Sequence, residues 1–355
     1  MRRTLYIWIG ACVALLAVLG VLLGALLLNS PDVPETEPIQ TTDTTPPPPT
    51  TTLPPETTAE PTTEATLPAP EFEIAATHAF VYDSTKGNVL FTKGDPTQRI
   101  SIASVTKLFT SFVALQYLQP DVVITAGEEV TWIDPDSSIA YILPDHQLTA
   151  DMCVQGLLMP SGNDAAYMLA VAAGRAIQNN PDLSAQAALG IFINEMNNQA
   201  QTLGMANSHF ANPDGIDAAG HYSCLEDLII LSRQALQTQN IKAYASMAKA
   251  DVVYESGETN TWYNSNALLH EQSPYYCEAA CGLKTGSTDE AGKCLVSAFK
   301  TEEGELLVGV FGCPEDADRY RDTLQLYSHY TGVPVELPVE TVPEDTTVET
   351  TQAAE

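Results

Sequence analysis

The chain has 355 residues, of which 45% are hydrophobic, so it can bury one large core or two modest ones. Asp and Glu number 45 against 15 Lys and Arg, which gives a formal net charge of −30 at pH 7. Many of these acids lie in residues 30–70 and 334–355, which contain no Lys or Arg, but the segment between them is also acidic. A surface of this sign repels phosphate backbones, so we exclude nucleic acid as a partner.

The first long apolar stretch runs from Leu5 to Leu28 and carries no charge. As a helix it is long enough to cross a hydrocarbon core of about 30 Å. Arg2 and Arg3 precede it, so the positive-inside rule predicts a short cytoplasmic N-terminus and an extracytoplasmic remainder. We therefore expect residues 1–29 to form a cytoplasmic stub and a single transmembrane signal-anchor. A cleaved signal peptide is the alternative, although no clear small-x-small cleavage site follows the run.

Composition then divides the rest of the chain. Residues 30–71 are rich in Pro, Thr and Glu and poor in large apolar residues, which predicts a disordered, extended linker. Residues 334–355 repeat this composition and are predicted to be a disordered acidic tail. The folded domain is therefore expected to span 72–333.

Six cysteines follow the apolar stretch, an even number in a compartment where disulfides can form. Disulfide bridges and buried free thiols both remain open as interpretations. The chain has no Cys-x-x-Cys motif and no second Cys/His pair at zinc spacing, so neither a metal nor another cofactor is expected. The six are Cys153, Cys224, Cys277, Cys281, Cys294 and Cys313.

Within the predicted domain, alternating apolar residues predict a β-hairpin over 79–91, with its turn at Lys86-Gly87-Asn88. Apolar residues at helical spacing then predict helices that begin near Ser104 and cover 153–159, 165–173, 191–203 and 225–236. Three strands at 281–284, 293–299 and 306–311 and a closing helix at 318–330 complete the pattern. This order suits an α+β fold whose antiparallel sheet is completed by both ends of the domain.

The first motif with chemical potential is Ser104-Val105-Thr106-Lys107, at the start of the first long helix. Positions i and i+3 share one face of a helix, so the hydroxyl of Ser104 and the amine of Lys107 come within hydrogen-bonding reach. A lysine acts as a base only when its pKa is lowered, which burial achieves. Such a quartet also occurs by accident on exposed helices, so by itself it is a weak signal.

Two further motifs lie downstream. Ser161-Gly162-Asn163 follows Pro160 between two apolar helices, where Ser161 can relay a proton and Asn163 can bind a substrate amide. Alternatively, Ser161 or Asn163 caps the next helix. Lys284-Thr285-Gly286 ends a predicted strand, and it offers a cation for a carboxylate, a hydroxyl donor and room for a peptide backbone.

Together, in this order, the three motifs are the signature of β-lactamases and penicillin-binding proteins. The chain resembles the low-molecular-mass penicillin-binding proteins that are serine-type D-alanyl-D-alanine carboxypeptidases, and the resemblance covers essentially all of 78–331. Further matching patterns are Val81-Tyr82-Asp83, Leu157-Leu158-Met159-Pro160, Leu203-Gly204-Met205, Asn212-Pro213-Asp214-Gly215, Gly220-His221-Tyr222-Ser223 and Asn264-Ser265-Asn266.

The resemblance implies a β-lactamase/DD-peptidase-like fold and a specific set of roles. Ser104 would be the acylated nucleophile, Lys107 its base and Ser161 the proton relay. Asn163, Lys284, Thr285, Gly286 and Ser287 would bind the substrate, with an oxyanion hole formed by the backbone N–H groups of Ser104 and Ser287. The implied partners are peptidoglycan stem peptides ending in D-Ala-D-Ala, β-lactam antibiotics as covalent inhibitors, and the bacterial cell membrane. Because no second β-rich domain or amphipathic helix is recognised after Thr331, we expect membrane attachment through the N-terminal helix.

The alternatives to a carboxypeptidase are a class A β-lactamase, a DD-endopeptidase, a non-catalytic penicillin-binding sensor and a Ser-His-Asp hydrolase. A class A β-lactamase needs a glutamate-held water, and Glu195 is the one acid at a comparable distance after Ser161, although it lies in an apparently continuous helix. A DD-endopeptidase would use the same motifs, and a non-catalytic penicillin-binding sensor would normally lack Ser104 or Lys107. No Gly-x-Ser-x-Gly elbow supports a Ser-His-Asp hydrolase, so His209 and His221 are expected to be structural.

Overall fold

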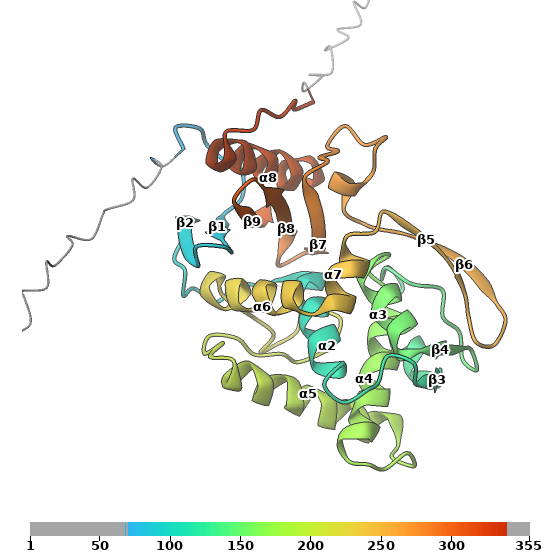
Figure 1. Cartoon of the computed structure of the whole chain (residues 1–355). Coiled ribbons are helices and arrows are strands. Elements are labelled where there is room, and N and C mark those ends of the chain that lie inside the picture. Colours follow the sequence, from blue (N-terminus) through green and yellow to red (C-terminus); the bar gives the residue numbers. More distant parts are fainter. Residues whose placement is uncertain (1–67, 69, 339–355) are drawn as a thin grey trace, which may run out of the picture. The chain divides into compact units, whose positions relative to one another are not determined.

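A computed structural model of the chain describes residue 68 and residues 70–338 (Figure 1). All of them belong to one structural unit, Glu64–Glu355. The predicted membrane anchor lies outside the described residues, as do most of the predicted linker and tail. Within the part of the chain that the structure describes, no helix is both long enough and apolar enough to span a bilayer.

The central feature is a five-stranded antiparallel sheet with the strand order β2-β1-β9-β8-β7. The first strand of the domain, β1, pairs inside this sheet with the last strand, β9, so the two ends of the domain meet in the sheet, as the order of predicted elements indicates. β7 lies at one edge of this sheet and is the strand nearest to the first helix. The strands are β1 (His78–Asp83), β2 (Asn88–Lys93), β7 (Ala280–Thr288), β8 (Gly292–Thr301) and β9 (Gly304–Cys313).

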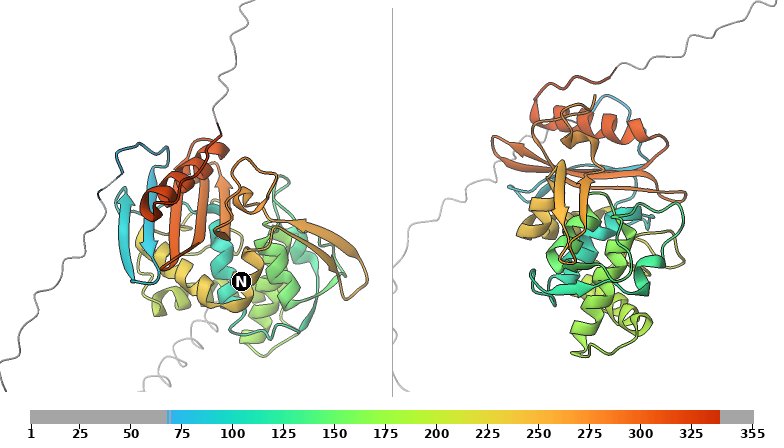
Figure 2. Two further views of the ribbon diagram at one scale, coloured as in Figure 1. Left: turned by 45° about the horizontal axis from the view of Figure 1, so that its top comes forward. Right: turned by 90° about the vertical axis from the view of Figure 1, so that its right-hand side faces the viewer.

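Both faces of the sheet are covered by helices (Figures 1 and 2). Because side chains alternate along a strand, Ala79 and Val81 of β1 join one apolar cluster while Phe80 joins the other. The closing helix α8 packs on the first cluster, where Phe299 and Tyr327 stack with ring centroids 4.4 Å apart. The remaining helices contribute to the second cluster, and they are α2 (Thr106–Ala114), α3 (Ala150–Leu158), α4 (Asn163–Ile177), α5 (Ala185–Thr202), α6 (Leu225–Gln237) and α7 (Gln239–Ala245).

Each predicted helix is present, but several begin earlier, and α7 was not predicted. α3 begins at Ala150, where the side chain of Thr149 accepts a hydrogen bond from the backbone N–H of Met152. α5 begins at Ala185 with Ser184 as its cap, and α8 spans Asp316–Thr331. These first turns consist of capping, polar and small residues, which carry no apolar periodicity. The predicted boundaries therefore cover mainly the buried middle of each helix.

Two small hairpins were not predicted. β3 (Val123–Thr125) pairs with β4 (Gln147–Thr149), and β5 (Lys249–Val253) pairs with β6 (Thr259–Tyr263). The second hairpin extends beside the helical part of the domain (Figure 2). Three single turns of 3-10 helix complete the described elements: η1 (Ala103–Val105), η2 (Glu128–Thr131) and η3 (Ala267–Leu269).

Candidate active site

The predicted nucleophile lies at the junction between the sheet and the helices. Ser104 is the middle residue of η1, and α2 begins two residues later at Thr106, so the helix start is a 3-10 turn. Lys107 Nζ lies 2.7 Å from Ser104 Oγ and donates a hydrogen bond of 2.7 Å to the carbonyl of Asp214. The predicted contact between the hydroxyl and the amine is therefore present in the structure.

Burial gives Lys107 the property that a base requires. The residue is 0% exposed, and loss of hydration lowers the pKa of its amine to about 8. The carboxylates of Asp214 and Asp164 act in the opposite direction, because negative charge favours the protonated amine. At pH 7 a pKa of about 8 leaves roughly a tenth of Lys107 neutral, and this form is able to accept the proton of Ser104.

The backbone around Ser104 is held by two close glycine contacts. Gly215 has a φ of +91°, and a Cβ at this position would lie 2.0 Å from the carbonyl oxygen of Ala103. On the other side, a Cβ on Gly286 would lie 3.0 Å from the Cβ of Ala103 and 3.3 Å from the backbone nitrogen of Ser104. Ala103 itself has a φ of +47°, which is uncommon for a residue with a side chain. The loop at Gly215 and strand β7 thus both lie in close contact with the turn that carries Ser104.

The Ser161-Gly162-Asn163 motif joins α3 to α4 in a strained turn. Ser161 is 5% exposed and has a φ of +63°, in the left-handed region. Helix α4 starts at Asn163 with Gly162 as its N-cap, so neither Ser161 nor Asn163 serves as the cap that the alternative interpretation proposed. The side-chain amide of Asn163 donates to Ser137 Oγ at 2.9 Å. The motif is therefore bound to the loop that precedes β4.

That loop is anchored by Asp164, which sequence reasoning did not single out. Its carboxylate, in a residue 1% exposed, accepts hydrogen bonds from the backbone N–H groups of Ala140, Ile142 and Ala165. On the other side, the carbonyl of Ala140 accepts hydrogen bonds from the β5–β6 hairpin, including one of 3.0 Å from Trp262 Nε1. The unpredicted hairpin therefore supports the loop that contacts Asn163.

The Lys284-Thr285-Gly286 motif differs from its prediction in one respect. It lies in the interior of β7, which continues to Thr288, because pairing with β8 extends through Ser287 and Thr288. Lys284 is 0% exposed, and burial together with the cations of Lys107 and Arg319 lowers its pKa well below the usual value. Thr285 Oγ1 lies 2.6 Å from Ser265 Oγ, and Ser287 Oγ accepts a 2.8 Å hydrogen bond from Lys293.

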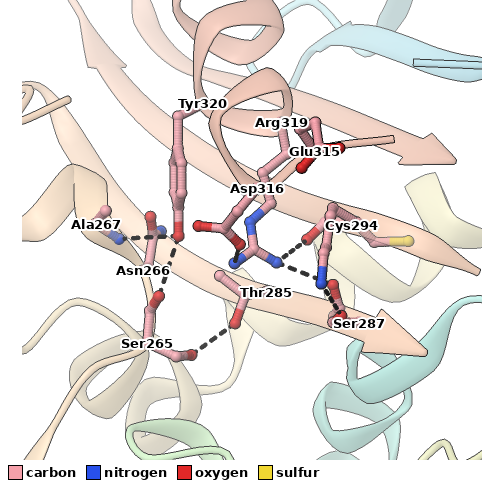
Figure 3. Close-up of polar contacts among 12 residues, drawn as sticks. Ser265, Asn266, Ala267, Thr285, Ser287, Cys294, Glu315, Asp316, Arg319 and Tyr320 are labelled. Atoms are coloured by element: carbon pink, nitrogen blue, oxygen red, sulfur yellow. Dashed lines mark hydrogen bonds and ion pairs between the residues drawn. The ribbon is translucent and has the colours of Figure 1, made fainter. Parts of the chain in front are cut away.

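Arg319 of α8 is a second cation at this strand that the motifs did not reveal. It is 7% exposed, and its guanidinium donates to the carbonyl of Gly286 at 3.0 Å (Figure 3). Arg319 lies 33 residues after Gly286 in the chain, and no local sequence pattern marks it. Because Arg319 and Lys107 both affect the pKa of Lys284, three buried basic side chains share this region.

His221 and Glu195 both make side-chain hydrogen bonds away from Ser104 and Lys107. His221 Nδ1 accepts from the backbone N–H of Ala211, so Nε2 carries the proton and donates to Thr106 Oγ1 at 2.8 Å. Burial lowers the pKa of His221 to about 4, which keeps it neutral and structural. Glu195 lies in α5, where its carboxylate accepts hydrogen bonds from Tyr117 and Gln199.

All six cysteines among residues 70–338 are free thiols, which is one of the two interpretations that the sequence left open. Burial raises the pKa of each of these thiols. In the same range, no group of three or more His, Cys, Asp or Glu side chains is arranged to hold a metal ion.

Comparison with known proteins agrees with this geometry. A family model described as D-alanyl-D-alanine carboxypeptidase matches residues 62–315. A D-alanyl-D-alanine carboxypeptidase from a Streptomyces strain is 34% identical over 260 residues, which cover 71% of this chain and 84% of that protein. The carboxypeptidase DacF of Bacillus subtilis is 26% identical over 249 residues, and the match covers 69% of this chain but only 59% of DacF.

Solved structures give the same answer. A DD-transpeptidase from Streptomyces has a TM-score of 0.66 and 27% identity, and the match covers 75% of this chain and 100% of that one. An ampicillin-bound penicillin-binding protein from Listeria monocytogenes has a TM-score of 0.59 and 25% identity, with 73% and 99% coverage. The family match spans more than half of the chain and includes all three motifs. The chain therefore belongs to the D-alanyl-D-alanine carboxypeptidase family and has the DD-peptidase fold.

Proposed function

We propose that the protein is a serine-type D-Ala-D-Ala carboxypeptidase that trims peptidoglycan stem pentapeptides through an acyl-enzyme on Ser104. The observation that carries this proposal is the 2.7 Å contact between Ser104 Oγ and the buried amine of Lys107. A neutral amine beside a hydroxyl activates it as a nucleophile without a histidine. Family membership and the order of the three motifs support the same reaction.

The substrate peptide would lie along the open edge of β7. An edge strand has unpaired backbone groups that bind an extended peptide by β-strand addition, and β7 occupies the edge next to Ser104. The carboxylate of the terminal D-Ala would bind Lys284 and Thr285, with Arg319 adding a second positive charge. Burial of positive charge away from water is unfavourable, and the lowered pKa of Lys284 reflects this cost. A bound carboxylate would offset the cost because it supplies the opposite charge. We name Lys284, Thr285 and Arg319 the carboxylate-binding cluster.

In the acylation step, Ser104 Oγ attacks the carbonyl carbon of the penultimate D-Ala and its proton passes to Lys107 Nζ. The carbonyl oxygen becomes an oxyanion, for which the backbone N–H groups of Ser104 and Ser287 are the proposed donors. When the C–N bond breaks, Ser161 relays a proton to the nitrogen of the departing D-Ala. Asn163 would hold an amide of the remaining stem peptide in place.

In the deacylation step, water attacks the ester carbonyl and gives its proton to Lys107. The C–O bond to Ser104 breaks, Ser104 Oγ regains a proton, and a tetrapeptide with a free carboxylate leaves. An amine could take the place of water, and the structural neighbours named DD-transpeptidase make transfer to an amine the second candidate reaction. Mass spectrometry of products from a defined pentapeptide, with and without an added acceptor amine, separates the two. A cross-linked dimer as substrate tests endopeptidase activity in the same assay.

Labelling with a fluorescent penicillin tests the nucleophile. A β-lactam is a cyclic amide with a nearby carboxylate, and the ampicillin-bound structural neighbour supports binding of this class of inhibitor. The full chain should form a covalent adduct, and Ser104→Ala should form none. Adduct formation by Ser104→Ala would contradict the assignment. Rapid release of hydrolysed penicillin in place of a lasting adduct would indicate a β-lactamase. A class A β-lactamase needs a glutamate that holds and activates a water, and Glu195 is poorly suited to this because its carboxylate is hydrogen-bonded to Tyr117 and Gln199.

We further propose that residues 1–29 anchor the enzyme in the bacterial cell membrane, with the catalytic domain on the extracytoplasmic side. The uncharged run from Leu5 to Leu28 and the preceding Arg2 and Arg3 support this orientation. Residues 30–71 would then act as a tether that lets the domain reach wall peptides. Membrane fractionation of the full chain and of a chain without residues 1–29 tests the anchor. Release of the full chain in soluble form would contradict it.

A further inference from the structure

The first turn of α8 connects an exposed acid to the carboxylate-binding cluster (Figure 3). Arg319 lies across the sheet edge, and its NH1 group donates to the carbonyls of Gly286 at 3.0 Å and Cys294 at 3.4 Å. Its NH2 group forms an ion pair with Asp316, three residues earlier on the same helix. The guanidinium therefore contacts β7 through its NH1 group and the carboxylate of Asp316 through its NH2 group.

The two members of this ion pair differ strongly in their surroundings. The side chain of Arg319 is 9% exposed, whereas that of Asp316 is 62% exposed. Within the described residues, Asp316 is the one carboxylate that forms an ion pair with any of the three buried basic side chains Lys107, Lys284 and Arg319. Because Asp316 is hydrated, it can release Arg319 at little cost, as is usual for an exposed partner.

We propose that Asp316 is an internal carboxylate that competes with the terminal carboxylate of the substrate for Arg319 and so sets the KM. This inference rests on the proposed function, because it assumes that a substrate carboxylate binds the cluster. When substrate is absent, Asp316 neutralises part of the positive charge of the cluster. When the substrate binds, its carboxylate takes over interactions with Arg319 that Asp316 held, and Asp316 is left to water.

The same competition favours release of the product. Free D-alanine leaves with its own carboxylate, and a cluster that held this anion too tightly would slow turnover. When the carboxylate of D-alanine leaves, Arg319 loses a favourable interaction. The ion pair between Asp316 and Arg319 then forms again and offsets that loss. Asp316 is thus a positioning and specificity residue that acts through Arg319, and it takes no part in the chemistry at Ser104.

Asp316→Asn tests the proposal because it removes the charge and keeps the size of the side chain. With a pentapeptide ending in D-Ala-D-Ala, we expect KM to fall about two- to fivefold, the range of an exposed ion pair. The inhibition constant of free D-alanine should fall by a similar factor, and kcat should not rise. Asp316→Glu keeps the charge and should retain a KM near that of the unmodified protein. A higher KM for Asp316→Asn would overturn the proposal, since it would mean that Asp316 only orients Arg319.

Glu303→Gln is the matched control for net charge. Glu303 is also an exposed acid in an ion pair, with Lys86, but it lies in the turn between β8 and β9. This turn follows the end of β8 that is remote from the residues paired with Gly286, Ser287 and Thr288. We expect its KM to be unchanged. An equal fall in KM for Glu303→Gln would assign the effect to overall charge and overturn the role of Asp316.

Penicillin labelling separates failure of this inference from failure of the proposed function. Asp316→Asn should increase the labelling rate with penicillin, which carries a carboxylate, and leave the rate with penicillin methyl ester unchanged. If the unmodified protein neither cleaves the pentapeptide nor becomes labelled, the proposed function fails and the inference fails with it. If it does both and Asp316→Asn alters neither KM nor labelling, the inference alone fails.

Discussion

Lys107 is completely buried, and its Nζ contacts both Ser104 Oγ and the backbone carbonyl of Asp214. Its pKa of about 8 lies below the usual value of 10.5, so the amine becomes neutral as the pH rises through 8. The second-order rate constant for acylation should therefore increase with pH and level off above about 8, falling tenfold per pH unit well below it. A pH series of penicillin labelling measures this rate constant in the free enzyme. A midpoint below pH 6 would assign the base to another group.

Lys107→Arg is the companion variant for this pH dependence. The guanidinium keeps a positive charge at every accessible pH, so it cannot accept the proton of Ser104. We expect acylation to fall by about 100-fold to 10,000-fold, the usual contribution of a general base, with no recovery at high pH. Circular dichroism controls for the fold. Recovery of labelling at pH 9 would argue against Lys107 as the base.

Asp164 supports the site through backbone hydrogen bonds. Its carboxylate accepts from Ala140 and Ile142 in the loop before β4 and from Ala165 in α4. Asp164→Asn replaces one accepting oxygen with an NH2 group that faces a backbone N–H, which leaves a buried donor unpaired. We expect a loss of about 1–3 kcal/mol in the free energy of unfolding, measured by denaturant titration. An unchanged midpoint would show that the loop does not depend on this carboxylate.

The contact between Ser104 and Lys107 was predictable from the sequence, but the residues that support the proposed site were not. Ser104 and Lys107 are three positions apart, so helix geometry alone brings them together. Arg319 contacts Gly286 only because β8, β9 and α8 fold back over β7, and no local pattern encodes that contact. Asp164 is adjacent to a predicted motif, yet its role depends on backbone groups more than twenty residues earlier. The spacing of a motif therefore identifies the residues proposed to react, whereas the residues that hold them in place become visible only in the tertiary structure.

At the scale of elements, the contact between β7 and η1 determines how closely strand β7, the proposed binding edge for the substrate, approaches Ser104. Gly286→Ala would put a Cβ 3.0 Å from the Cβ of Ala103 and 3.3 Å from the nitrogen of Ser104. The strand or the turn must shift by a few tenths of an ångström. Because catalysis is sensitive to such displacement, we expect acylation to slow by about 10- to 100-fold. Stability should fall by about 1–3 kcal/mol, the usual cost of overpacking.

Gly190→Ala is the matched control for this substitution. Gly190 is an exposed residue of α5, and a Cβ there meets nothing within 4 Å. Replacing glycine by alanine inside a helix raises stability by about 0.5–1 kcal/mol, so this variant should label at the normal rate and unfold slightly later. Normal labelling by Gly286→Ala as well would mean that the close approach of β7 is unimportant for acylation.

The same elements explain where sequence prediction stopped. The predicted strand ended at Lys284 because Thr285, Gly286 and Ser287 are common in turns, whereas pairing with β8 carries β7 on to Thr288. β6 was missed because its residues are mostly polar, and its one fully buried side chain, Trp262, contacts distant Ala140. By contrast, β1 and β2 are rich in apolar and aromatic residues and flank a turn that contains Gly87, so this hairpin was predicted correctly.

At the scale of the whole molecule, the order of predicted elements was sufficient for the α+β class, because strands at both ends of a domain commonly pair in one sheet. The structure confirms this with the pairing of β1 and β9. The predicted domain boundary at 333 is less sharp. Val335 and Leu337 pack against the apolar cluster under α8, so the packed chain continues past it. Amino-acid composition identifies the polar tail, but it cannot show that single apolar residues such as Val335 and Leu337 pack against the folded domain.

The net charge of −30 gives a prediction for the whole molecule that the local site alone would not. A stem peptide that ends in a free carboxylate is attracted by the carboxylate-binding cluster but repelled by the acidic body at longer range. Salt screens the long-range repulsion more than the contacts of a buried cluster, because the screening length falls from about 30 Å at 0.01 M to about 8 Å at 0.15 M. We therefore expect kcat/KM for an anionic pentapeptide to rise severalfold between these ionic strengths, measured by D-alanine release. Labelling by penicillin methyl ester, which lacks the carboxylate, should stay constant over the same range. A fall in kcat/KM with salt would mean that the buried cations dominate the approach of the substrate even at long range.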